Sequence, residues 1–321
     1  MWYNVPMNKE RLGKGCVNDT YLVKNTDGTP AYVLQRINTV AFQKVESLMD
    51  NILKISSYIK SQGGKTLDFL PFEDGQYLKV DEEGTWRKMA YIPSYSTDTA
   101  DDFKLIEGAG VAFGTFLQNI QDFSGNLYET IPEFHNTVKR LSDCMTAADK
   151  DEFNRASSAK DLLLEIEKRY NVISNDYKTL LSCGPERITH NDTKISNVLF
   201  DLDSHEPICV VDLDTVMMGM TLYDFGDAAR SIALEPNSSG ALKFNKDKYD
   251  CFKNAYLKNT ENILTKDEVE NLMLATDTIS TELGVRFLED YLNGDKYFNA
   301  ASSNENLQKA RKLLTYTFKL D

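Results

Sequence analysis

The sequence predicts an α+β protein with two lobes, a small β-rich N-terminal lobe and a larger, mostly helical C-terminal lobe. Short runs of β-branched and aromatic residues alternate with turn sequences over residues 1–92. After Pro93 the apolar residues recur mainly at helical spacing. A length of 321 residues suits two domains, or one domain with two lobes. We therefore expect lobes formed by 1–92 and 93–321, joined by a short hinge near 90–97.

The N-terminal lobe is expected to contain two strands, one helix and a hairpin. Residues 19–25 and 31–38 have strand composition and are separated by the turn sequence TDGTP. Residues 40–59 carry an apolar stripe at helical spacing, which predicts a helix. Residues 76–80 and 85–92 flank the sequence DEEG, which predicts a hairpin.

The C-terminal lobe is expected to be helical around a central region of loops and short strands. Helical spacing predicts helices over 103–120 and 161–181. Residues 190–215 contain short apolar runs typical of strands. A capping box, TKDE at 265–268, predicts the start of one long helix that continues to Phe287.

Charge and cysteine usage restrict the possible partners. The net charge of −13 disfavours binding to nucleic acid, because an acidic protein repels the phosphate backbone. We find no apolar run of about 20 residues and no signal-peptide pattern, so we expect no membrane partner. The five cysteines are scattered and form no CxxC pair, which fits reduced thiols in the cytoplasm. We expect a cytoplasmic monomer or weak homodimer with a small-molecule substrate.

The segment H-N-D-T-K-I-S-N at 190–197 carries the strongest chemical signal. It matches the pattern H-x-D-x-x-x-x-N of phosphoryl-transfer catalytic loops. Asp192 would accept a hydrogen bond from a substrate hydroxyl and orient it for attack. Asn197 would offer its side-chain oxygen to Mg²⁺, and His190 would pack beneath the loop as a structural residue.

The sequence ICVVDLD, an apolar strand that ends in two acids, follows this loop. Asp212 is expected to be the second Mg²⁺ ligand, and Asp214 to assist at the metal or through a hydrogen bond. Residues 224–226 read Asp-Phe-Gly, but they adjoin a predicted helix. We therefore interpret Asp224 as a support that holds the catalytic loop by accepting backbone N–H bonds.

The N-terminal lobe is expected to bind the nucleotide. The sequence GKGCVNDT at 13–20 forms a glycine-rich turn whose N–H groups could approach phosphates. Arg36 lies on the second predicted strand, where it could bind phosphate and pair with Glu46. The residues expected to contact the nucleotide are Gly13, Gly15, Asn18, Arg36, Glu46, Ala90 and Ile92.

Taken together, THNDTKISNVLFD, VVDLDTVMMG and LYDFGD resemble the aminoglycoside phosphotransferase and choline kinase superfamily, whose members have a protein-kinase-like fold. More narrowly, NDTYLV, YVLQRIN and ELGVRFLEDYLNGDKYF resemble bacterial N-acetylhexosamine 1-kinases. The likeness runs from Gly13 to about Phe298.

The resemblance implies phosphorylation of the anomeric hydroxyl of GlcNAc or GalNAc, with ATP and Mg²⁺ as cofactors. It implies that Asp192 is the catalytic base and that Arg286 and Tyr297 bind the sugar. Cys16 stands in the glycine-rich turn near the expected sugar site, where a more polar residue is usual in the family. Lys194 also departs from the family pattern, so the preferred hexosamine is open.

Two other functions remain open from the sequence. The same fold could phosphorylate an amino alcohol, methylthioribose or an aminoglycoside, although an arginine in the acceptor site argues against a cation. The chain could instead be a nucleotide-binding pseudokinase, although Asp192, Asn197 and Asp212 are all present.

Overall fold

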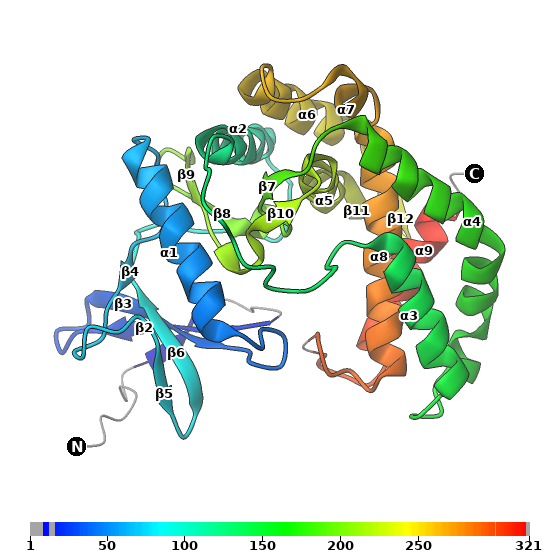
Figure 1. Ribbon diagram of the computed structural model, residues 1–321, viewed down its shortest axis with the longest axis horizontal. Helices are drawn as coiled ribbons and strands as arrows, with labels where there is room; N and C mark the ends of the chain where they lie inside the picture. The colour runs from blue at the N-terminus through cyan, green and yellow to red at the C-terminus, as the bar shows by residue number, and fades with distance from the viewer. Residues whose placement is uncertain (1–8, 13–16, 299, 319–321) are drawn as a thin grey trace.

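The computed structural model describes residues 9–12, 17–298 and 300–318 (Figure 1). The described N-terminal part is an antiparallel sheet in the order β1-β2-β3-β6-β4, with β5 also paired to β6. The sheet strands are β1 Lys9–Arg11, β2 Asp19–Lys24, β3 Pro30–Ile37, β4 Phe69–Leu70, β5 Lys79–Asp81 and β6 Gly84–Met89. A mostly helical part follows, so the predicted α+β class with a protein-kinase-like, two-lobed arrangement is confirmed.

The helical part surrounds three short two-stranded ladders. Its helices are α2 Phe103–Ile120, α3 Thr137–Lys150, α4 Lys160–Cys183, α5 Thr221–Ala233, α6 Lys246–Thr260, α7 Lys266–Glu270, α8 Leu272–Leu292 and α9 Glu305–Thr317. Its strands are β7 Arg187–Thr189, β8 Val198–Phe200, β9 Pro207–Val210, β10 Met217–Gly219, β11 Leu234–Pro236 and β12 Leu242–Phe244. The pairs are β7 with β10, β8 with β9, and β11 with β12.

Helix α1, Val45–Ser61, belongs to the core of the helical part although the chain reaches it from the sheet. Its buried stripe, which includes Leu48, Ile52 and Ile55, joins one apolar cluster with α2, α5 and the strands around the candidate catalytic loop. Asn51 on the same helix donates a 2.7 Å hydrogen bond to the Tyr128 carbonyl. Figure 1 shows α1 between the sheet and the helical part.

Two further apolar clusters lie outside this central core. One contains buried residues of α3, α4, α8 and α9, and so unites the helices at the far end of the helical part. The other is small and lies on the sheet, formed by Val23, Leu34 and Trp86 with neighbouring aromatic rings. Because Leu34 and Trp86 are buried in this cluster, the side chains next to them along β3 and β6 point to the opposite face of the sheet.

The prediction of one long helix from the capping box to Phe287 is wrong. The capping box is present, since Thr265 and Glu268 exchange hydrogen bonds at the start of α7. However, α7 ends at Glu270, and Asn271 leaves the helical conformation with ψ 14° before α8 begins. The first helix of the chain also starts at Val45, five residues later than its apolar pattern suggested.

Within the ranges that the structure describes, no helix combines the length and apolar character needed to cross a bilayer.

Candidate active site

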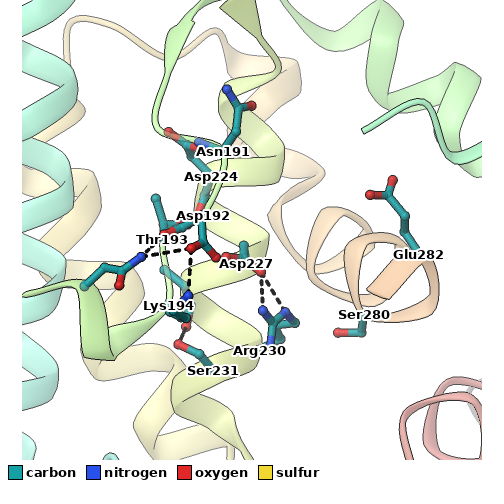
Figure 2. A network of polar contacts seen from close by, with 12 residues as sticks. Asn191, Asp192, Thr193, Lys194, Asp224, Asp227, Arg230, Ser231, Ser280 and Glu282 are labelled. Atoms are coloured by element: carbon teal, nitrogen blue, oxygen red, sulfur yellow. Dashed lines mark hydrogen bonds and ion pairs between the residues drawn. The ribbon is translucent and has the colours of Figure 1, made fainter. Parts of the chain in front are cut away.

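The segment 190–197 forms a loop between β7 and β8, and buried side chains fix its backbone (Figure 2). Asp224, near the start of α5, accepts 2.7 Å hydrogen bonds from the N–H groups of His190 and Asn191. Burial nevertheless raises the pKa of Asp224 to about 7. Asn191 has φ 63°, a left-handed conformation that Asn adopts more readily than most residues. Asp224 therefore fixes the backbone at the start of the loop 190–197.

His190 is fully buried beneath this loop, with Phe113 and Phe116 against its ring. Its Nε2 lies 2.9 Å from the Val211 carbonyl oxygen, and its Nδ1 lies 3.2 Å from the N–H of Asp192. This pattern requires the tautomer protonated at Nε2. Burial lowers the pKa of His190, so the ring stays neutral. Both nitrogens are occupied, which leaves His190 a structural role.

Asp192 and Asn197 face one another across the loop. The Asn197 amide nitrogen donates to the backbone oxygen of Asp192 at 2.7 Å and to its carboxylate at 3.1 Å. Because the nitrogen is used in this way, the amide oxygen of Asn197 points elsewhere and is available as a ligand. The Lys194 ammonium lies 2.7 Å from the carboxylate of Asp192, as Figure 2 shows.

The charge state of Asp192 follows from these contacts. Burial acts to raise its pKa, but the Lys194 ammonium, together with the hydrogen bond from Asn197, outweighs burial and brings the pKa down to about 2. The carboxylate is therefore ionised at neutral pH. It is a weak base, so its main capacity is to accept and orient a hydroxyl hydrogen.

Asp212 follows β9 and has φ 64°, which turns the chain sharply into the short helix Leu213–Thr215. Burial and the nearby Asp214 raise the pKa of Asp212 to about 7. A nearby cation stabilises a carboxylate whose ionised form is disfavoured by burial and by a neighbouring acid. The described residues contain no cluster of three or more His, Cys, Asp or Glu side chains suited to a metal. Asp212 and the Asn197 oxygen instead fit Mg²⁺, which is usually held by one or two carboxylates together with substrate phosphates.

Asp214 joins the two lobes through a buried polar cluster that the sequence did not reveal. Its carboxylate lies 2.6 Å from the Arg87 guanidinium of β6, and both side chains are almost inaccessible, at 3% and 2% exposed. Asn18 donates a 2.7 Å hydrogen bond to the same carboxylate. Gln35 accepts two bonds from Arg87, at 2.9 and 2.6 Å. One guanidinium nitrogen of Arg87, Nη1, is buried without a hydrogen-bond partner.

The predicted pair between Arg36 and Glu46 is wrong. Arg36 pairs with Asp19 instead, and its side chain is 41% exposed. Glu46 lies exposed in the first turn of α1. The reason is the alternation of side chains along β3, which turns Gln35 toward Arg87 and Arg36 toward the opposite face.

The remaining nucleotide-site residues fall into two groups. Gly13 and Gly15 lie outside the described residues, as does Cys16, which was expected near the sugar. At the hinge, the N–H of Ala90 is committed to the Asp68 carbonyl at 2.8 Å. The carbonyl oxygen of Ile92 accepts a 2.9 Å bond from the Ser94 hydroxyl.

Arg286 and Tyr297 are brought together on the other side of Asp192. The guanidinium carbon of Arg286 lies 4.3 Å from the ring centre of Phe134 and 5.8 Å from that of Tyr297. Burial raises the pKa of the Tyr297 hydroxyl, while Arg286 opposes this shift and Asp192 adds to it. Arg286 and Asp192 therefore both lie within electrostatic range of the Tyr297 hydroxyl.

The loop that carries Tyr297 is held by Asp290, which the sequence had not singled out. Its carboxylate accepts hydrogen bonds of 2.9, 2.8 and 3.0 Å from the N–H groups of residues 296, 297 and 298. Asn306 of α9 donates a further bond of 3.0 Å. Gly294, with φ 89°, allows the chain to turn back after α8. A single buried carboxylate thus organises the segment after α8.

Known structures share this architecture over nearly the whole chain. Amicoumacin kinase hAmiN, in complex with AMP-PNP, Ca²⁺ and Ami, matches with a TM-score of 0.64 and 14% identity, covering 99% of this chain and 90% of that one. An ethanolamine kinase from Plasmodium vivax matches with a TM-score of 0.59 and 13% identity, covering 97% and 82%. The ADP-bound aminoglycoside phosphotransferase APH(2'')-Ib gives 0.59 and 14%, covering 97% and 93%. At these identities the likeness shows the fold.

Sequence comparison is more specific than the structural likeness. The profile of the phosphotransferase enzyme family, APH, matches residues 10–246. That range contains the sheet, the catalytic loop, Asp212 and Asp224. This chain belongs to the phosphotransferase enzyme family.

Proposed function

We propose that this phosphotransferase uses ATP and Mg²⁺ to phosphorylate the anomeric hydroxyl of an N-acetylhexosamine, GlcNAc or GalNAc, giving the sugar 1-phosphate. Residues 1–92 would bind the nucleotide, and residues 93–321 would supply catalysis and acceptor binding. The observation that supports the proposal is that Arg286 lies 5.8 Å from the ring centre of Tyr297 and that Tyr297 lies within electrostatic range of Asp192. An arginine stacked on aromatic rings next to a hydroxyl-orienting carboxylate suits a polar, uncharged ring better than a cation.

The nucleotide side of the proposal rests on two oxygen ligands and one buried cation. Asn197 and Asp212 would hold Mg²⁺, which when bound neutralises charge on the phosphate oxygens. Arg87 takes the phosphate-binding role that the sequence suggested for Arg36. Its contact with Asp214, two residues after Asp212, supports this assignment.

In the proposed reaction, the carboxylate of Asp192 accepts a hydrogen bond from the C1 hydroxyl. The hydroxyl oxygen attacks the γ-phosphorus, the bond from phosphorus to the ADP oxygen breaks, and the hydroxyl proton passes to Asp192. A carboxylate with a pKa of about 2 is a weak base, so the proton moves late. Catalysis then comes mainly from positioning and charge neutralisation. A turnover of roughly 1–100 s⁻¹ would be ordinary.

Two acidic groups near Arg286 are already engaged within the protein, which favours an uncharged acceptor. Glu282 is bonded to His135 and Thr137, and Asp290 is occupied by backbone N–H groups. Neither carboxylate is therefore free to bind an ammonium group.

The second candidate is a kinase for an amino alcohol, methylthioribose or an aminoglycoside. Structures named for ethanolamine, choline and aminoglycoside acceptors share the fold, and this observation favours it. Asp192, Asn197 and Asp212 would keep their roles in such an enzyme.

The test is a panel assay with Mg·ATP and GlcNAc, GalNAc, glucose, galactose, choline, methylthioribose and kanamycin. ADP formation is recorded, sugar products are tested for loss of the reducing end, and Asp192→Asn is the control. ADP made only with N-acetylhexosamines, with a non-reducing product, supports the proposal. Turnover only on choline, methylthioribose or kanamycin refutes the sugar assignment. Nucleotide binding with no turnover on any acceptor favours a pseudokinase.

A further inference from the structure

His135 occupies an unusual place between the candidate acceptor site and the catalytic loop. It lies in the segment between α2 and α3 and is mostly buried, with 13% of its side chain exposed. One ring nitrogen, Nδ1, lies 2.6 Å from the carboxylate of Glu282 on α8. The other, Nε2, lies 2.9 Å from the backbone carbonyl oxygen of Asn191. That carbonyl belongs to the peptide bond immediately before Asp192.

The bonding pattern specifies the charge of this pair. A carbonyl and a carboxylate are both acceptors, so each ring nitrogen of His135 must present a hydrogen. Glu282 is fully buried, and burial acts to raise its pKa, but His135, Arg286 and Thr137 outweigh burial and lower it. Glu282 is therefore ionised and His135 is its cationic partner. A buried pair of this kind is costly to break, because the remaining charge loses its partner.

Three different elements hold Asn191. Its N–H donates to Asp224 of α5, and its side-chain amide donates to the Thr215 carbonyl at 2.9 Å. Its carbonyl accepts a hydrogen bond from the other side, from His135. Since the left-handed backbone of Asn191 costs free energy, it persists only while its surroundings hold it.

The same pair also reaches the acceptor side. Glu282 lies one helical turn before Arg286 on α8, close enough for Arg286 to lower its pKa. The other carboxylate oxygen of Glu282 accepts a 2.6 Å bond from Thr137, which in turn bonds Tyr223. A line of hydrogen bonds therefore runs from Glu282 through His135 to the peptide that carries Asp192, and Arg286 lies within electrostatic range of its start.

We propose that the His135–Glu282 pair is a positioning device that sets the orientation of Asp192 from the acceptor side, through the Asn191 carbonyl. Asp224 holds the preceding peptide of the loop, through the N–H of Asn191. This inference rests on the proposed role of Asp192 in phosphoryl transfer. His135 contacts neither acceptor nor nucleotide in this scheme and acts only through the loop.

The test compares His135→Phe, which keeps ring volume but removes both donors, with His135→Gln, which keeps an amide donor. His205→Gln, at the exposed histidine between β8 and β9, is the matched control. Kinetics would be measured on the accepted substrate, and exchange of backbone amides over 188–197 would be followed by mass spectrometry on the same proteins.

We expect His135→Phe to lower kcat by about 10- to 100-fold, because small misplacements of a catalytic group have effects of this size. The KM for the nucleotide should stay near the wild-type value, and His135→Gln should recover part of the loss. Amide exchange over 188–197 should be faster in His135→Phe and unchanged in His205→Gln.

Equal losses for His135→Phe and His135→Gln, or a change confined to nucleotide KM, would overturn the inference. So would unchanged exchange over the loop. If the wild-type protein transfers phosphate to no acceptor, the proposed function fails, and the exchange measurement alone decides whether His135 positions the loop.

Discussion

Replacing Arg87 by Met tests both the stability of the structure and the reassignment of the phosphate-binding cation. The change removes the guanidinium but keeps an unbranched apolar side chain at a position with 2% exposure. Asp214 would then be a buried carboxylate whose remaining partner is the amide of Asn18. The matched control is Arg36→Met, on the neighbouring strand, where the ion pair with Asp19 is partly exposed.

The expected effects differ because the two ion pairs differ in burial. Breaking a buried pair by removing one partner lowers the free energy of unfolding by about 3–5 kcal/mol. Breaking an exposed pair costs roughly 0–1 kcal/mol. A charge-assisted hydrogen bond to phosphate contributes about 1.5–3 kcal/mol. Arg87→Met should therefore weaken Mg·ATP binding by about 10- to 100-fold, and Arg36→Met should leave it almost unchanged.

Urea unfolding followed by circular dichroism measures the change in the free energy of unfolding, and titration calorimetry measures the change in affinity for Mg·ATP. The double variant Arg87→Met/Asp214→Asn adds a cycle, because removing both charges should restore part of the stability lost in Arg87→Met. Equal losses in the two single variants would refute the burial argument. Loss of nucleotide binding in Arg36→Met, with binding intact in Arg87→Met, would return the phosphate role to Arg36.

Three further predictions follow from the site. Asp192→Asn should lower the rate of transfer by about 100- to 10,000-fold with nucleotide binding retained, and a calorimetric loss of ATP binding would contradict that role. Burial raises the pKa of Asp224 from its ordinary value of 3.8 to about 7 in the folded protein. Between these two pH values, the folded protein holds a proton that the unfolded chain has released. Stability should fall as pH rises from about 4 to 7, and Asp224→Asn should flatten part of this slope in denaturation midpoints; a slope of opposite sign would refute it. Asp290→Asn should raise the KM for the acceptor while the KM for ATP stays constant, since the three N–H groups of 296–298 lose part of their acceptor; an effect on ATP alone would contradict it.

The sequence predicted the parts of the site that are close together along the chain. Asp192 and Asn197 are five residues apart, and a single loop turn brings them together. Asp224 could be interpreted correctly as a loop support because the residues around it already had helical character. In each case, local spacing was enough to place one side chain relative to another.

The missed residues depend on pairing between distant segments. Arg36 and Arg87 both lie in central strands of the sheet, and only the register of β3 against β6 decides which one faces Asp214. His135 and Glu282 are separated by 147 residues, and no local pattern links them. Asp290 lies within the stretch ELGVRFLEDYLNGDKYF that carries the resemblance, but its role depends on a chain reversal that only the structure displays.

The membership of α1 in the central core has a mechanical consequence. The buried stripe of α1 lies in the same apolar cluster as Ile195 of the candidate catalytic loop, and of the flanking strands Ile37 at the end of β3 and Phe69 at the start of β4 also reach this cluster. If the sheet swings toward or away from bound nucleotide, α1 stays behind with the helical part. The pivots then lie at the two ends of α1, around 38–44 and 62–68, as well as at 90–97. In such a motion the sheet alone would move. The buried contact of Arg87 with Asp214 lies across the boundary between the sheet and the helical part.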